Sequence, residues 1–104
     1  METMPVLFVS HGAPTLAIDP GKIEPELTAL GQSLPPPKSI VIVSPHGISP
    51  STRVTTSARP GVVHDFGGFP QILYTLDYPA EGNPPLAEEI IDLMNEAGWQ
   101  TTGD

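Results

Sequence analysis

Two short apolar runs, each followed closely by a histidine, constrain what this chain can fold into. Residues 6–10 (VLFVS) lead directly into His11, and residues 39–44 (SIVIVS) lead through Pro45 into His46. Such runs, rich in valine and isoleucine and bounded by glycine or proline, are typical of buried strands in a parallel sheet. Ligands of such sheets bind outside the carboxyl ends of the strands. Because neutral imidazole is a common metal ligand, the two histidines predict a shared metal site there.

Each histidine alone has a simpler interpretation. A lone histidine after a strand more often caps a loop by hydrogen bonding than binds a metal. The repetition favours the metal site, because Ser10 and Ser44 end the two runs, and Gly12 and Gly47 follow the two histidines. A glycine at that position lets the backbone approach a bound group closely.

The composition narrows the class of protein. With 104 residues the chain forms one domain at most, and its 14 prolines predict long irregular connections. The net charge of −8, with only four Lys and Arg residues, predicts no nucleic-acid and no membrane partner. The absence of cysteine excludes disulfides and thiolate chemistry. No apolar run approaches the roughly 20 residues that span a bilayer, and no basic signal region opens the chain, so we expect a cytoplasmic protein.

Strand-like and helix-like segments alternate along the chain, which predicts an α/β fold. The predicted strands cover 6–10, 39–44 and 53–58, with a fourth beginning at 99–102. The predicted helical segments cover 25–30, 71–76 and 84–97. Gly31 is expected to end the first helix and Gly98 the last. The last helix is the clearest because its apolar residues recur at helical spacing.

The C-terminal segment after Gly98 is typical of a strand that follows a helix in a β-α-β unit. A parallel sheet normally continues and is covered on both faces. Three strands and one strong helix are few for such a sheet. We therefore expect an incomplete domain over 1–104, completed by further chain or by a partner, although a small complete domain with a frayed end is the alternative.

Three blocks of sequence resemble segments of one known enzyme family. Residues 5–14 (PVLFVSHGAP) resemble the family's N-terminus, and residues 40–47 (IVIVSPHG) resemble its strand ending in Ser-Ala-His-Trp. Residues 64–74 (HDFGGFPQILY) resemble its Asp-Phe-Gly-Gly-Phe-Pro segment. The three blocks occur in the family's order over almost the whole chain. The family that they resemble is the class III extradiol ring-cleaving dioxygenases, and most closely their 4,5-DOPA extradiol dioxygenase-like subgroup.

The resemblance implies a fold, a reaction and a metal. The fold is a three-layer α/β domain with a parallel-sheet core, of which residues 1–104 are the N-terminal portion. The reaction is extradiol ring cleavage of a catechol-type substrate by O2 at a mononuclear non-haem metal, iron(II) in active enzymes and zinc in some purified ones. His11 and His46 correspond to the first two metal ligands. The third ligand and the catalytic acid–base histidine belong to the family's C-terminal half, so no catalytic residue is expected within this chain. The isolated chain is then expected to self-associate or to need its missing half.

Four further residues are candidates for substrate binding or for a second shell around the metal: Ser10, Ser44, His64 and Asp65. The serines would hydrogen-bond near the metal, and Asp65 would orient a ligating histidine. The alternative is structural: the serines cap strand ends, and Asp65 with its glycines builds a turn.

Other residues of the three blocks have two interpretations. Pro45 and Gly47 replace the family's Ala and Trp, which changes the expected pocket wall beside His46. Phe66 and Phe69 would wall an aromatic substrate or, more simply, pack in the core. Arg53 and Arg59 would meet a substrate carboxylate or, more simply, lie exposed at a strand edge.

Two other functions remain open from the sequence. One is a non-catalytic metal-binding remnant, a truncated product that folds in part and performs no chemistry. The other is a tetrapyrrole metal chelatase, whose first strand also ends in a His-Gly-Ser-like turn. The block at 65–70 argues against the chelatase.

Overall fold

The computed structural model describes residues 3–9 and 12–104 and divides the chain between two units. The first unit comprises Met1–Ile40 and His64–Leu76, and the second comprises Val41–Val63 and Asp77–Asp104. Each unit is therefore assembled from two stretches that are distant in sequence.

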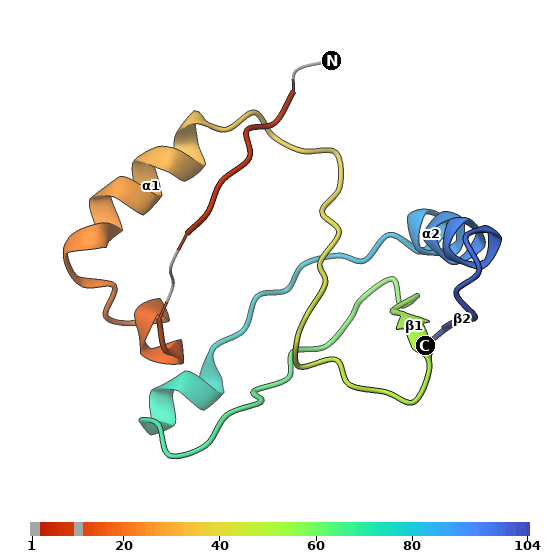
Figure 1. The fold of residues 1–104 in the computed structure, drawn as a ribbon. Helices are drawn as coiled ribbons and strands as arrows, with labels where there is room; N and C mark the ends of the chain where they lie inside the picture. Colours follow the sequence, from red (N-terminus) through yellow and green to blue (C-terminus); the bar gives the residue numbers. More distant parts are fainter. Residues whose placement is uncertain (1–2, 10–11) are drawn as a thin grey trace. The chain divides into compact units, whose positions relative to one another are not determined.

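The second unit is built around a parallel β-α-β arrangement (Figure 1). Strand β1, Thr52–Val54, pairs in parallel with strand β2, Thr101–Gly103, and helix α2, Pro84–Glu96, packs on both. The register pairs Thr52 with Thr101, Arg53 with Thr102 and Val54 with Gly103. The ladder continues one step further, because Asp104 N donates to Val54 O at 2.9 Å. The parallel pairing and the helical crossover confirm the predicted α/β class.

Helix α2 matches the predicted helix 84–97 to within one residue at its end, where Ala97 is the C-cap. Its start is fixed by Asn83, whose Oδ1 accepts the backbone N–H of Leu86 at 3.1 Å, and by the two prolines of the first turn, whose missing N–H groups cost nothing there. It ends before Gly98, which has φ +96°, a backbone conformation that favours glycine.

The core of the second unit is small and lies between α2 and the strands. Ala87 and Ile91 of α2 are 6% and 8% exposed, and Thr101 at the start of β2 is 5% exposed. The side chain of Asn95 hydrogen-bonds to both the carbonyl and the N–H of the Thr101 backbone. Asn95 Nδ2 donates to Thr101 O at 3.1 Å, and Thr101 N donates to Asn95 Oδ1 at 2.8 Å. This pair of bonds fixes the connection from helix to strand.

The first unit is mostly short helical turns. Its elements are η1 Pro14–Ala17, η2 Gly21–Ile23, α1 Glu24–Ser33 and η3 Gln71–Thr75. Leu73 of η3 is 1% exposed, and η3 contacts η1. The helical turns predicted at 71–76 are thus present.

Helix α1 is longer than the predicted 25–30, and Gly31 lies inside it, so the prediction that Gly31 ends this helix is wrong. The helix stops at Ser33 because three prolines follow at 35–37. Leu34 precedes them in an extended conformation, with ψ 138°, since a residue before proline is driven out of the helical region.

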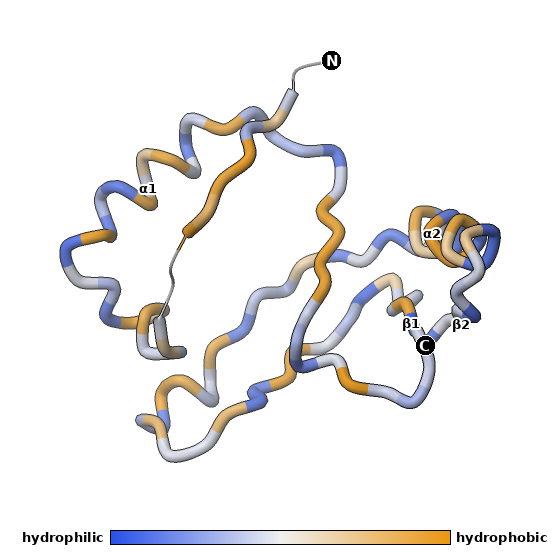
Figure 2. Tube along the Cα trace, viewed as in Figure 1, coloured by the Kyte–Doolittle hydropathy of each residue, from blue (hydrophilic) through white to orange (hydrophobic). Residues whose placement is uncertain are grey.

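The two apolar runs next to the histidines are not strands in the described residues, which corrects the prediction. Residues 3–9 and 39–43 have no ladder partner there, and their apolar side chains are open to solvent: Val6, Phe8, Ile42 and Val43 are 101%, 100%, 80% and 94% exposed. Figure 2 shows both runs as hydrophobic stretches of chain outside any helix or strand. A strand is defined by hydrogen bonds to another strand, and apolar composition alone does not supply that partner.

The other two predicted strands are present in shortened form. The strand predicted at 53–58 is present only as β1, which overlaps that run at 53–54, and the strand predicted to begin at 99 is β2, which begins two residues later. Within residues 3–9 and 12–104, no helix is long and apolar enough to cross a membrane.

Candidate metal centre

His46 lies exposed on a short turn that directly follows the second apolar run. Ser44 builds this turn: its Oγ accepts the backbone N–H of His46 at 3.1 Å, and its carbonyl oxygen accepts Gly47 N at 3.3 Å. The predicted cap of a strand end is absent because residues 39–43 are not a strand; Ser44 instead fixes the turn from which the imidazole of His46 projects. The proximity of Ser44 to a metal stays a prediction.

Ser10 and His11 lie outside the described residues, so the predicted pairing of His11 with His46 stays a prediction. The residue after His11 is described: Gly12 has φ +63°, in the left-handed region that side-chain-bearing residues rarely adopt. The chain thus requires a glycine directly after His11, and the residue directly after His46 is also a glycine.

Over the part of the chain that the structure describes, no three His, Asp or Glu side chains gather as a metal-binding group. The donor set that the sequence predicts, the imidazoles of His11 and His46, stays a prediction. Imidazole suits both iron(II) and zinc, and a mononuclear iron site of the facial type needs two histidines and one carboxylate. The histidines fit two of those positions.

His64 belongs to an aromatic cluster in the first unit. Its ring lies 6.0 Å from that of Phe66, nearly perpendicular at 82°, and 6.3 Å from that of Tyr74. His64 Nε2 is 2.8 Å from the carbonyl oxygen of Leu76. A carbonyl can only accept, so Nε2 carries the proton and is not available as a metal ligand in this arrangement.

The glycine-rich block around His64 is held together by its own side chains. Phe66 packs edge-on against Phe69, with ring centroids 5.4 Å apart, and Tyr74 Oη donates to Phe66 O at 3.3 Å. Phe66 N donates to His64 O at 2.9 Å, which closes a tight turn around the exposed Asp65. These contacts favour the structural interpretation of Phe66 and Phe69. A role of His64 and Asp65 beside the metal stays a prediction.

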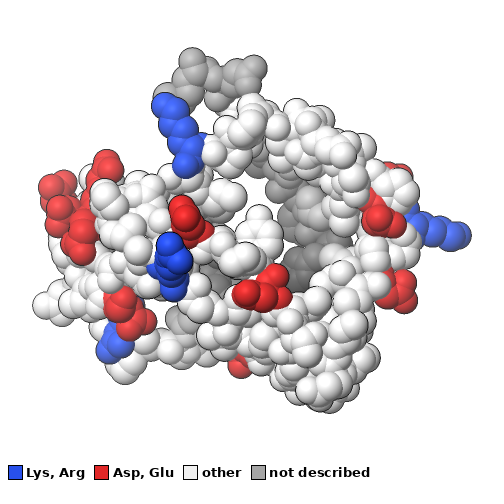
Figure 3. Space-filling model, turned by 180° about the vertical axis from the view of Figure 1, so that it is seen from behind, with Lys and Arg blue, Asp and Glu red and all other residues white. Residues whose placement is uncertain are grey.

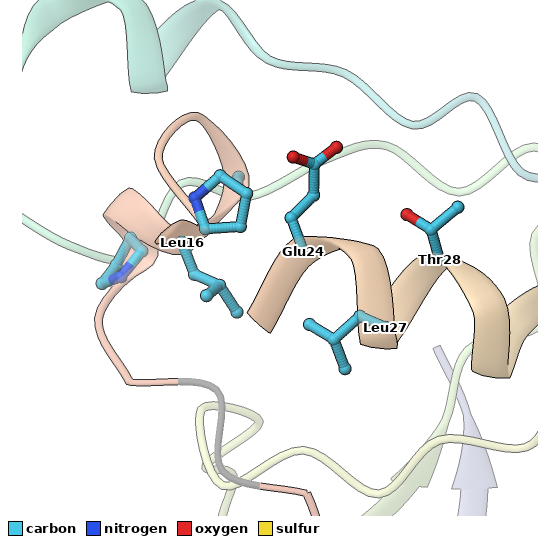
Figure 4. A pocket seen from close by; sticks show the side chains of 7 residues that line it. Leu16, Glu24, Leu27 and Thr28 are labelled. Atoms are coloured by element: carbon cyan, nitrogen blue, oxygen red, sulfur yellow. The ribbon is translucent and has the colours of Figure 1, made fainter. Parts of the chain in front are cut away.

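A hollow follows each of the two candidate ligands in the chain. The first, of about 360 Å³, is lined by Pro14, Leu16, Ala17, Pro20, Glu24, Leu27 and Thr28. It is mainly apolar: Leu16 of η1 and Leu27 of α1 face each other, with Glu24 at the start of α1 on its rim (Figure 4). It begins three residues after His11.

The second hollow, of about 420 Å³, begins directly after His46 and is mainly polar. It is lined by Gly47, Ser49, Pro50, Ser51, Thr52 and Arg53. The sequence left two interpretations of Arg53, contact with a substrate carboxylate or an exposed strand-edge position, and it did not predict this hollow. The signal was the run of hydroxyl residues between His46 and Arg53.

Acidic residues outnumber basic residues on this chain. The chain has 12 acidic and four basic residues. On the face seen in Figure 3, Lys and Arg side chains stand singly rather than in a patch. An anion that approaches this face would therefore meet an individual basic side chain and not a broad positive field.

Comparison with known proteins identifies the family. Residues 5–103 match the family described as the catalytic LigB subunit of aromatic ring-opening dioxygenase. Among curated proteins, the 4,5-DOPA dioxygenase extradiol of Escherichia coli K12 is 43% identical over 91 residues, which is 88% of this chain and 34% of that protein.

Two further curated proteins that are similar to this chain are also named as dioxygenases. The 4,5-DOPA dioxygenase extradiol of Beta vulgaris is 34% identical over 97 residues, covering 90% of this chain and 36% of the relative. The dioxygenase tasH of Hapsidospora irregularis is 30% identical over 100 residues, covering 86% of this chain and 31% of the relative. The chain spans about a third of the length of the curated relatives it matches. It belongs to the LigB family of aromatic ring-opening dioxygenases.

Proposed function

We propose that residues 1–104 are the N-terminal portion of the catalytic domain of an extradiol dioxygenase that opens the ring of catechol-type substrates with O2. The observation that carries the proposal is the family match over residues 5–103, which includes both histidine blocks. Relatives that are 34–43% identical are named 4,5-DOPA dioxygenase extradiol, which supports a dihydroxyphenyl substrate. The complete domain would then be the three-layer α/β fold, with β1 and β2 as part of its central sheet.

In this proposal His11 and His46 hold one metal ion, iron(II) in the active protein and zinc as a substitute. Bound iron(II) would supply the redox coupling between the catechol and O2 that organic side chains cannot provide. The third ligand and the general base would come from outside these residues. Within this chain, Ser44 positions the backbone of His46 through the 3.1 Å bond from the His46 N–H to Ser44 Oγ.

The two exposed apolar runs support the view that more protein covers this portion. Phe8 and Val43 are 100% and 94% exposed, and strand-like runs with free edges recruit other chains. In the complete domain they would become central strands, which would bring His11 and His46 to one sheet edge. In the isolated chain they would drive self-association.

Calorimetric titration with zinc tests the metal assignment. The unmodified chain should bind one zinc ion weakly, because two imidazoles leave positions that only water fills. His11→Ala and His46→Ala should each abolish this binding. His64→Gln is the matched control, since glutamine removes the imidazole but keeps an N–H to donate to Leu76 O, and it should leave zinc binding unchanged. Equal zinc affinity in the unmodified chain and both alanine variants would refute the assignment.

Oxygen uptake tests whether residues 1–104 need the rest of the domain for catalysis. The chain loaded anaerobically with iron(II) and mixed with a catechol should consume little oxygen, since the loss of a general base alone costs about 10²–10⁴-fold in rate. Rapid, iron-dependent oxygen uptake by a monomer of 104 residues would show that these residues form a complete enzyme and that the proposal of a larger domain is wrong.

A further inference from the structure

Helix α2 carries a second row of apolar side chains besides the face that packs on the strands. Ala87 and Ile91 form the buried face. Leu86 and Ile90 directly precede these two residues and so lie about 100° further round the helix, and Leu93 continues their row at helical spacing. Leu93 is 56% exposed, and Leu86 and Ile90 are half-buried. This row, called the α2 stripe below, is therefore only partly covered by the packing on β1 and β2.

Trp99 stands at the C-terminal end of the α2 stripe. Trp99 N donates to Met94 O at 3.0 Å, and Gly98 N donates to Asn95 O at 3.0 Å. With Gly98 at φ +96°, these two bonds form a Schellman motif. In this motif the residue after the glycine turns back toward the last turn of the helix, where Leu93 lies. Trp99 is nevertheless 61% exposed, so a large aromatic side chain at this end of the helix is open to another molecule.

The charges beside the α2 stripe are all negative. Glu89 and Glu96 are exposed and come three residues after Leu86 and Leu93, which makes them neighbours of the stripe on the helix surface. The last Lys or Arg of the chain is Arg59, and eight of the 12 acidic residues follow it. An apolar stripe that is flanked by carboxylates complements an amphipathic segment with Lys or Arg beside its apolar face.

A second copy of this chain does not provide that complement. Two facing α2 helices would bring their Glu89 and Glu96 side chains together, with no Lys or Arg on either helix to separate them.

We propose that the α2 stripe, together with Trp99, binds a basic amphipathic helix of a partner protein. Apolar residues of the partner helix pack on the stripe, and its Lys or Arg residues meet Glu89 and Glu96. Trp99 is the anchor, because exposed tryptophans that become buried on binding contribute strongly to affinity. The proposed surface contains no histidine and does not depend on the metal site.

The emission of Trp99 tests this proposal, because Trp99 is the single tryptophan of the chain. The probe is a tryptophan-free helical peptide of leucine and lysine, with leucine at helical spacing. The chain is kept dilute enough to sediment as a monomer. The peptide should shift the emission to shorter wavelength and saturate at one peptide per chain. A scrambled peptide of the same composition should bind roughly tenfold more weakly, and a peptide with glutamate in place of lysine should not bind.

Leu93→Ser tests the apolar part of the surface. It leaves the buried face of α2 intact, so hydrogen exchange at the amides of Ala87 and Ile91 should stay slow, while the affinity for the basic peptide should fall roughly tenfold. Ile48→Ser is the matched control, since Ile48 is 90% exposed and lies outside α2, and it should leave binding unchanged.

Glu89→Gln and Glu96→Gln test the charges. Each should weaken binding several-fold at low salt and much less at high salt, because salt screens exposed charges. Glu26→Gln, the same change on helix α1, should have no effect.

Equal affinity for the ordered and scrambled peptides, or full affinity in Leu93→Ser, would overturn the proposal. A Trp99 shift that follows the concentration of the chain alone, and that disappears in Leu93→Ser, would assign the stripe to a second copy instead. In the longer protein of the proposed function, an α2 stripe that is already closed to the peptide would show that the protein's own remainder covers it, which would also overturn the proposal. None of these results bears on zinc binding by the histidines.

Discussion

Asn95→Ala should destabilise the β1–α2–β2 unit strongly, because this side chain makes two hydrogen bonds to one buried residue. Asn95 Nδ2 and Oδ1 satisfy the carbonyl and the N–H of Thr101 at 3.1 and 2.8 Å, and Thr101 is only 5% exposed. A buried polar group that loses its partner costs about 1–3 kcal/mol. With two groups affected and some access for water, the expected loss is about 2–4 kcal/mol. Ala87 and Ile91 are the buried apolar residues of this unit, so such a loss is a large part of its stability.

Trp99 is the single tryptophan of the chain and lies between α2 and β2, so its fluorescence reports on this unit during urea unfolding. The urea midpoint of Asn95→Ala should fall, and hydrogen exchange at the Thr101 amide should accelerate by roughly 30- to 700-fold, the equivalent of that free energy. Gln100→Ala removes an exposed amide five residues along the chain and should change the stability by less than about 0.5 kcal/mol. Equal stability of these two variants would refute the role assigned to Asn95.

Three other substitutions test separate parts of the structure. Asn83→Ala should cost about 1 kcal/mol by removing the cap on Leu86 N, seen as faster exchange in the first turn of α2; unchanged exchange would contradict the cap. Gly82→Ala should destabilise the second unit by about 1–3 kcal/mol in urea, because the new Cβ would collide with the backbone carbonyl of Ser57; a tolerated alanine would contradict this packing. Ile42→Ser should lower the average mass of the isolated chain in sedimentation, since Ile42 is 80% exposed; an unchanged mass would exclude this run from self-association.

Local sequence signals predicted the helices better than the strands. Helix α2 was predicted almost to the residue because its apolar spacing, its starting prolines and its capping asparagine all act within a few positions of the chain. The end of α1 was missed because the prolines at 35–37 outweigh a single Gly31, which a helix tolerates at a cost of about 1 kcal/mol.

Strand pairing depends on residues that are far apart in sequence, which explains the errors there. The run at 39–44 has the composition of a buried strand but finds no partner among the described residues, whereas the more polar Thr52–Val54 pairs with Thr101–Gly103 across almost 50 positions. The bonds from Asn95 to Thr101 were not predicted for the same reason, since they depend on how the chain turns between α2 and β2.

Only part of the candidate site could be predicted from the sequence. The residues of the three blocks suggested the family, and the family match confirmed it. The bond from His46 N–H to Ser44 Oγ is local, but the sequence predicted Ser44 as the cap of a strand end, and in the structure it builds a turn instead. The hollow that ends at Arg53 was not predicted, because it requires both the fold of the segment after His46 and the side of β1 on which Arg53 lies.

The central claim, that His11 and His46 hold one metal ion, is tested most directly by 15N NMR of the histidine rings during titration with zinc. The ring signals of His11 and His46 should shift together and saturate at one zinc ion per chain, while those of His64 should keep the pattern of an Nε2–H tautomer bonded to Leu76 O. Independent shifts of the two rings at different zinc concentrations, or a shift of the His64 ring in place of either, would contradict this claim.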